Sequence, residues 1–164
     1  MKKIALLFSM LFVLAMANDL KAQNYQSAVG LRLGVPLGIS YKFFISEPGA
    51  IELYLGFRSY SFGYTYINPG AMYQHHFPIS SIDGLSWYVG GGASVFLYNY
   101  KSSFGGVEDG SFGIGLNGVL GLDYKFTNAP INISADWTPT IYLSGYNTGF
   151  GGGAGALSVR YVLN

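Results

Sequence analysis

The chain lacks cysteine and has few charged residues, and both absences exclude common classes of protein. Without cysteine among its 164 residues there is no disulfide scaffold, thiolate zinc site or catalytic thiol. Charged residues make up 10% of the chain, whereas about 25% is usual in soluble domains. A formal net charge of +1 offers no basic surface for nucleic acid. The 24 glycines recur too often for long helices, so the composition favours a β-rich chain that faces something other than water.

Residues 1–22 are expected to form a signal peptide that is cleaved. Lys2 and Lys3 give it a basic start, and an apolar run follows over residues 4–17. This run is shorter than the ~20 residues that a membrane-spanning helix needs, and Ala22 offers a small residue at the cleavage point. The mature chain, residues 23–164, is then exported as a single domain.

The mature chain alternates apolar and polar residues with a period of two, which is typical of β-strands with two different faces. Turn-forming or polar residues separate the alternating segments. The expected strands are 25–34, 38–45, 50–60, 70–77, 85–98, 111–126, 131–143 and 151–164. An even set of sequential strands closes most simply into an up-and-down barrel, which leaves no exposed sheet edge.

Charged side chains separate onto one face of these strands. After removal of residues 1–22, six basic and seven acidic residues remain, and every one that falls in a strand lies opposite the apolar face. The polar face is rich in Gly, Ser and Asn, which suit the crowded lumen of an eight-stranded barrel. We therefore expect an all-β, eight-stranded antiparallel transmembrane β-barrel whose apolar face meets lipid.

The inward charges are expected to form a structural ion network that plugs the lumen, because a buried charge without a partner is costly. Asp136 and Arg160 lie on neighbouring strands and are the expected central pair. The expected network comprises Arg32, Lys42, Glu52, Arg58, Asp123, Lys125, Asp136 and Arg160.

Aromatic residues gather near one rim of the apolar face if the N-terminus lies in the periplasm. Such a girdle marks the interface between membrane and water. The expected girdle comprises Tyr25, Phe43, Phe77, Trp87, Tyr124, Phe126 and Tyr161.

With this pattern, the mature chain resembles the small OmpX/OmpA-type eight-stranded outer-membrane barrels of Gram-negative bacteria. Its last strand, Leu157-Ser158-Val159-Arg160-Tyr161-Val162-Leu163, is similar to the C-terminal signal read by the barrel-assembly machinery, which usually ends in an aromatic residue where this chain has Asn164. The resemblance implies a monomer in the cell outer membrane, with lipid and lipopolysaccharide around it and the assembly machinery as a partner during insertion.

Two motifs could carry chemistry, and each has a structural interpretation that we favour. Gly113–Gly118 matches G-x-G-x-x-G, but a dinucleotide site needs a helix after the motif, and this one lies inside a strand. His75 and His76 are adjacent and point to opposite faces, so they cannot share a metal. We expect no cofactor and no metal.

The expected function is that of a non-enzymatic integral outer-membrane barrel with a structural or surface-recognition role, the latter through the loop of residues 99–110. One alternative is an outer-membrane lipid-modifying enzyme similar to lipid A acyl hydrolases or transferases. Both histidines, however, lie at the periplasmic end of their strand, far from the outer leaflet, and leave such an enzyme without a base. A secreted, soluble lipocalin-like barrel is the third interpretation.

Overall fold

The computed structural model describes residues 25–60, 64–100, 110–145 and 148–163. The expected signal peptide, residues 1–22, and most of the expected recognition loop, residues 101–109, lie outside the described residues. Within the described ranges, no helix is long and apolar enough to cross a membrane.

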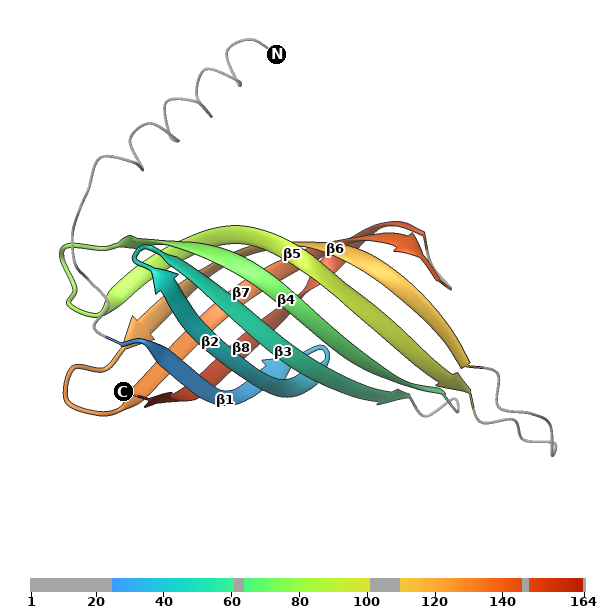
Figure 1. The fold of residues 1–164 in the computed structure, drawn as a ribbon, viewed down its shortest axis with the longest axis horizontal. Coiled ribbons are helices and arrows are strands. Elements are labelled where there is room, and N and C mark those ends of the chain that lie inside the picture. Colours follow the sequence, from blue (N-terminus) through green and yellow to red (C-terminus); the bar gives the residue numbers. More distant parts are fainter. Residues whose placement is uncertain (1–24, 61–63, 101–109, 146–147, 164) are drawn as a thin grey trace, which may run out of the picture.

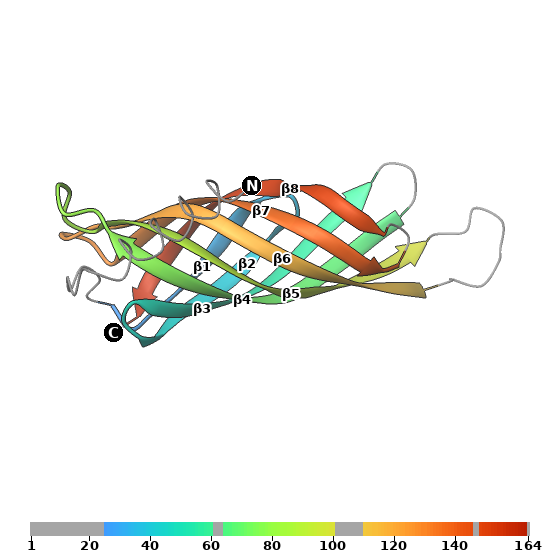
Figure 2. The same ribbon diagram turned by 90° about the horizontal axis from the view of Figure 1, so that it is seen from above.

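Eight antiparallel strands form a closed barrel in which each strand pairs with the next and β8 pairs with β1. Figures 1 and 2 show the strands tilted against the long axis of the barrel. The strands are β1 (Ser27–Gly34), β2 (Leu37–Ser46), β3 (Gly49–Tyr60), β4 (Tyr64–Pro78), β5 (Leu85–Tyr100), β6 (Gly110–Lys125), β7 (Ile131–Ser144) and β8 (Gly149–Leu163). The expected all-β, eight-stranded, up-and-down barrel is confirmed.

The two ends of the barrel differ. At one end, called the turn end here, β1 begins, β8 ends, and short connections join β2 to β3, β4 to β5 and β6 to β7 (left in Figure 1). The opposite end is called the loop end. There the β1–β2 hairpin stops well short of β5 and β6 (Figure 1), because β1 and β2 have 8 and 10 residues whereas β5 and β6 have 16 each.

Strand β4 begins at Tyr64, six residues earlier than the sequence pattern predicts. The pattern is interrupted at Pro69, which has no N–H to donate to a neighbouring strand. The structure replaces that donor locally, because the Asn68 side-chain amide donates a 2.9 Å hydrogen bond to the carbonyl oxygen of Val95 on β5. Strand β4 therefore continues through a proline that reads as a break in the sequence.

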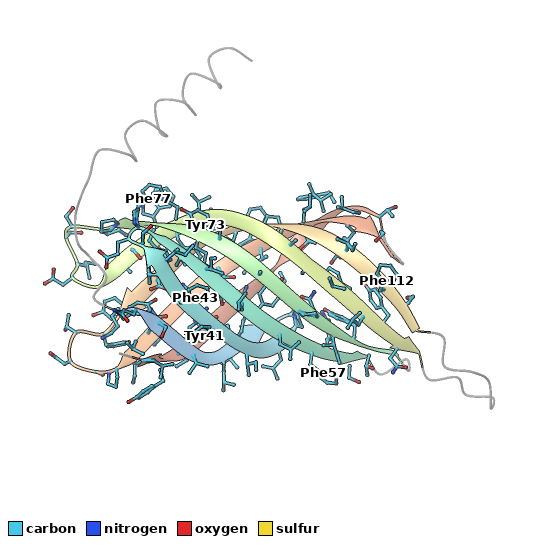
Figure 3. All side chains as sticks on the ribbon, in the orientation of Figure 1. Tyr41, Phe43, Phe57, Tyr73, Phe77 and Phe112 are labelled. Carbon is cyan, nitrogen blue, oxygen red and sulfur yellow. The ribbon has the colours of Figure 1, made fainter. Side chains whose placement is uncertain are left out.

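The barrel has an apolar outside and a polar inside. The largest fully buried side chains are Arg160, Tyr88, Lys42, Met72, Gln74 and Glu52. Large apolar side chains instead cover the outer surface on every strand (Figure 3), among them Leu31, Ile39, Leu53, Tyr73, Val89, Leu116, Ile141 and Val159. A soluble protein of this size buries such residues, so this distribution is inverted.

Candidate functional site

The lumen contains a buried network of three ion pairs. Lys42 Nζ lies 2.7 Å from Asp123 Oδ1, Arg32 Nη2 lies 2.5 Å from Asp136 Oδ1, and Arg160 pairs with Glu52. All six side chains are 8% exposed or less. Three positive and three negative charges therefore balance inside the barrel.

One longer ion contact and the hydrogen bonds of Asn132 join the three pairs into one continuous network. Arg32 also lies 3.6 Å from Glu52, which connects the Asp136 pair to the Arg160 pair. Asn132 links the remaining pair, because its amide donates to Asp123 at 2.6 Å while its oxygen accepts from Arg160 at 3.3 Å.

Polar neighbours form hydrogen bonds with many of the donor and acceptor atoms that the ion pairs leave unused. Arg160 donates to the hydroxyls of Ser40 and Ser134, both at 2.8 Å. Asp136 accepts from Thr138 at 3.1 Å and from Tyr88 at 3.0 Å. Gln74 on β4 donates to Glu52 at 2.5 Å. Buried charges need such partners to offset the loss of hydration, and this network, which we call the lumen network, supplies them from all eight strands.

The structure pairs these residues differently from the expected central pair. Asp136 contacts Arg32 rather than Arg160, because the β7–β8 register places Asp136 opposite Ala156 and places Asn132 opposite Arg160. The expectation of an Asp136–Arg160 pair is therefore wrong. A shift of four residues along a tilted strand moves an inward side chain to another level of the lumen.

Two of the expected network residues lie apart from the three ion pairs. Lys125 sits at the turn end, where its ammonium donates to the carbonyl oxygens of Phe126 and Ala129, the latter at 3.0 Å. Arg58 lines a cavity nearer the loop end. Because β6 ends at Lys125, the carbonyl oxygens of the following turn lie within reach of its ammonium group and accept its hydrogen bonds.

Two tyrosine rings fill the lumen beside the ion pairs, and glycines make room for them. A Cβ on Gly70 would lie 2.4 Å from Tyr54 Cζ, and a Cβ on Gly121 would lie 2.6 Å from Tyr88 Cζ. The Arg32 guanidinium carbon lies 5.6 Å from the centroid of the Tyr54 ring, and Lys42 Nζ lies 4.6 Å from the centroid of the Tyr88 ring. The high glycine content is therefore partly a packing requirement of the lumen.

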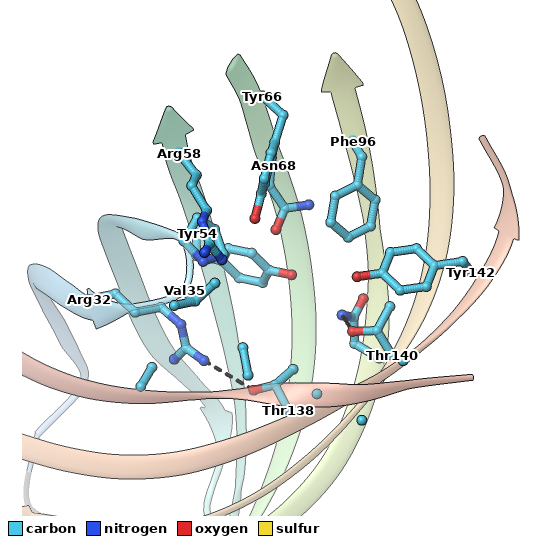
Figure 4. A pocket seen from close by; sticks show the side chains of 17 residues that line it. Arg32, Val35, Tyr54, Arg58, Tyr66, Asn68, Phe96, Thr138, Thr140 and Tyr142 are labelled. Carbon is cyan, nitrogen blue, oxygen red and sulfur yellow. Dashed lines mark hydrogen bonds between the residues drawn. The ribbon is translucent and has the colours of Figure 1, made fainter. Parts of the chain in front are cut away.

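A cavity of about 270 Å³, called the upper cavity here, lies on the loop-end side of the lumen network. Figure 4 shows the rings of Tyr54, Phe96 and Tyr142 reaching into it from different parts of the wall. Polar side chains, including Asn68 and Thr140, face the same space. The sequence pattern placed Tyr54 and Thr140 on the inner face and left Asn68 in a connection, and it gave no sign that a space remained between these residues.

Six of the seven expected girdle residues lie on the outer face near the turn end. Phe77 stacks on Trp87 at 4.3 Å between ring centroids, and Tyr124 meets Phe126 edge-on at 4.7 Å. Tyr161 is 58% exposed, and Phe43 packs against Tyr41 (Figure 3).

Tyr25 is the exception and is placed wrongly by the sequence pattern. It is 5% exposed and packs inside against Ala28, Val162 and Phe44. The alternation fails here because the chain bends at Gln26, before β1 begins at Ser27.

The expected girdle covers one rim and leaves out outward phenylalanines toward the loop end, although the alternation places Phe57 on the apolar face. Phe57 and Phe112 project outward there (Figure 3), and Phe150 is 71% exposed near the start of β8. The signal that could have found them is their position at the ends of odd strands and the starts of even strands. Aromatic side chains therefore flank the apolar surface at both ends, as at two membrane interfaces.

The histidines do not build an accessible catalytic site. His75 is half-buried on the outer face between Tyr73 and Phe77. His76 points inward, with Nδ1 3.1 Å from Ser86 Oγ, but the two residues are 3% and 1% exposed. A substrate could not reach this Ser–His contact. Among the described residues, no group of three or more His, Cys, Asp or Glu could hold a metal ion.

The motif Gly113–Gly118 lies within the unbroken strand β6. Its inward glycines are tightly packed: a Cβ on Gly113 would lie 2.7 Å from the Ser144 carbonyl oxygen, and one on Gly115 would lie 2.8 Å from Thr140 Cγ2. Without a helix after it, the motif lacks the helix N-terminus that binds a pyrophosphate.

No protein-family model matches the chain, and no curated protein matches its sequence. Among solved structures, the N-terminal β-barrel domain of Pseudomonas aeruginosa OprF is similar with a TM-score of 0.67 at 17% identity, covering 85% of this chain and 100% of that one. Neisserial surface protein A is similar with a TM-score of 0.56 at 18% identity, covering 84% of this chain and 95% of that one. Both neighbours are outer-membrane barrels, and the likeness shows that this chain shares their fold.

Proposed function

We propose that the chain is an integral outer-membrane barrel with a non-enzymatic role, structural or in recognition at the cell surface. The observation that carries the proposal is the inverted distribution of side chains: Leu116 and Leu120 are 47% and 48% exposed, whereas Lys42 and Glu52 are fully buried. Apolar side chains around a closed wall suit lipid on the outside. Closure also pairs the backbone groups that a membrane could not satisfy.

The outer membrane is the membrane that fits this barrel best. Backbone-satisfied barrels and helices are the two structures that span bilayers, and barrels of this kind belong to outer membranes. The basic and apolar start of the chain, residues 1–22, supports export. Lipid and lipopolysaccharide would surround the barrel, and the barrel-assembly machinery would insert it as a monomer.

The lumen network acts in this proposal as a seal. An eight-stranded barrel is just wide enough for its side chains to fill, and here Arg160, Glu52 and Lys42 occupy that space with their partners. A sealed lumen has no path for solutes, so the barrel would not act as a pore. Its contribution would come from its surface and from the loop end.

Three measurements test the proposal together. The protein, refolded in detergent, should migrate as a heat-modifiable species on gels, and the native protein should fractionate with the outer membrane. In planar bilayers it should show no steady conductance. Recovery as a soluble periplasmic monomer would overturn the membrane assignment, and a steady conductance of the wild type would overturn the seal.

A further inference from the structure

The upper cavity is a space that the lumen network leaves unfilled. It begins where that network ends, at Arg32 and Thr138, and it extends toward the loop end. Native interiors rarely leave room larger than a water molecule. The volume of about 270 Å³ is instead close to the lower limit of a small-molecule site, ~300 Å³. The size suits a ligand built on a single ring.

The charged side chains of the wall are already engaged. Arg32 pairs with Asp136 in the lumen network, and Arg58 has an interaction partner of its own, so we assign no anion to either guanidinium. Among the described residues that line the cavity there is no aspartate or glutamate to hold a cation. The neutral groups of the wall therefore define the ligand.

Two buried polar side chains face the cavity with hydrogen-bonding capacity left over. The Asn68 amide donates to the carbonyl oxygen of Val95, which sets its orientation, and within the described part of the chain its Oδ1 accepts no hydrogen bond. Thr140 accepts from Asn117 at 2.9 Å, and its own hydroxyl proton has no acceptor among the described residues. Asn68 and Thr140 are 3% and 6% exposed. Buried groups of this kind normally have a partner, so both point to an occupant of the cavity.

Asn117 adds a further donor of fixed direction. Its oxygen accepts from Ser94 at 2.9 Å and one amide N–H donates to Thr140, which leaves the second N–H unused within the described ranges. The Tyr54 hydroxyl also points into the space (Figure 4). Acceptor and donors thus come from different strands of the wall. A molecule with several hydroxyls matches such a set, because each hydroxyl can both donate and accept.

Aromatic rings line another part of the cavity. Phe96 on β5 lies 6.0 Å from Tyr66 on β4 and 5.1 Å from Tyr142 on β7, measured between ring centroids. Ordered water needs two to four polar partners, which the carbon atoms of these rings do not supply. The C–H groups of a saturated ring are instead attracted to aromatic faces. The wall as a whole suits a molecule with a C–H face and a hydroxyl edge.

The β8 side of the cavity is thinly covered. Gly152 and Gly153 line the cavity and are exposed, and they lie beyond Ala156, the last residue of β8 that pairs with β1. A Cβ on Gly152 would have no atom within 4 Å. This side, above the short β1–β2 hairpin, is where a ligand would enter.

We infer that the upper cavity binds a neutral monosaccharide. The sugar hydroxyls contact Asn68, Asn117 and Thr140, and the C–H face of the ring lies against Phe96. The inference rests on the proposed function, because it names a ligand class for recognition at the loop end, the end that would face the cell exterior.

The test uses glucose, galactose and mannose as probes, each titrated into the detergent-refolded full chain and followed by saturation-transfer difference NMR. At least one sugar should bind saturably, and its uronate, the anionic match, should bind no more tightly. Thr140→Val keeps the shape of the side chain and removes the hydroxyl, so it should weaken binding about three- to tenfold. Thr65→Val is the matched control and should leave binding unchanged, since Thr65 is next to the buried Tyr66 on β4 and faces outward.

A second variant tests the place of binding. Ala154→Phe adds a ring to the cavity wall and should abolish sugar binding, while heat-modifiability on gels shows that the barrel has folded. Thr140→Val carries the test alone if Ala154→Phe does not fold. Unchanged binding by either folded variant would overturn the inference, and so would tighter binding of the uronate, which would assign recognition to charge.

Failure of the inference can be told apart from failure of the proposed function. A folded, non-conducting wild type that binds none of the three sugars would hold water only in this cavity, which would overturn the inference alone. A chain that conducts or remains soluble without detergent would overturn the proposed function and this inference with it.

Discussion

Arg32 and Asp136 form a two-bonded ion pair inside the barrel, although 104 positions separate them in the sequence. Arg32 Nη1 donates to Asp136 Oδ2 at 2.9 Å and Nη2 donates to Oδ1 at 2.5 Å. The pair joins β1 to β7 across β8. It links, from inside the lumen, two strands that lie on opposite sides of the β1–β8 closure.

Asp136→Ala should therefore leave the buried Arg32 with Glu52, 3.6 Å away and already paired with Arg160, as its remaining acidic partner. The free energy of unfolding should fall by about 3–5 kcal/mol, the usual cost of removing one partner of a buried ion pair. Urea titrations of the detergent-refolded protein measure this loss. Asp83→Ala, in the exposed β4–β5 connection, is the matched control and should have little effect.

The double variant Arg32→Met with Asp136→Ala separates a structural network from a solvated one. Removing both charges should recover much of the loss, because the unpaired guanidinium is gone. If both single variants match the wild type, water screens these charges and the lumen is not sealed at this level.

Gly70→Ala should destabilise the barrel by about 1–3 kcal/mol, the typical cost of overpacking. The new Cβ would lie 2.4 Å from Tyr54 Cζ, so the ring must leave its place in the lumen. Gly152→Ala is the control, since a Cβ there has no atom within 4 Å. Adding Tyr54→Leu to Gly70→Ala should restore part of the loss, and failure to do so would assign the cost to the backbone instead.

Leu120→Arg should destabilise the barrel in lipid vesicles by about 2–4 kcal/mol, whereas Leu143→Arg should cost about 0–1 kcal/mol. Leu120 is exposed in the middle part of the wall, opposite Trp137. Leu143 is exposed beside the loop end of β7. Equal costs at the two positions would mean that lipid depth does not govern them.

The sequence predicts the fold well because every strand repeats the same two-residue alternation. Its eight strands, their order and the inward placement of Arg32, Lys42 and Glu52 follow from that pattern. A slip by one residue would exchange the apolar and polar faces of a strand. The pattern therefore excludes register shifts by an odd number of residues.

The pairing inside the lumen could not be predicted in the same way. Which charges meet depends on the tilt and on the register around the closed wall, and a slip by two residues keeps every side chain on its face. Asp136 therefore meets Arg32 rather than Arg160, although all three point inward as expected. Tyr25 was misplaced for a different reason: the bend at Gln26 separates it from β1, so the alternation of the strand does not extend to Tyr25.

The most direct test of the account is the environment of Trp137, because the chain has only two tryptophans and the account places both on the outer face. Trp137 is 48% exposed in the middle of β7. Trp87→Phe leaves it as the sole tryptophan of the protein refolded in vesicles, and excitation at the red edge of tryptophan absorption selects its emission over that of the 14 tyrosines. Lipids brominated along the acyl chain should quench its emission strongly, and aqueous iodide should not. Quenching by iodide with no effect of the brominated lipids would contradict the central claim that this apolar surface faces a membrane.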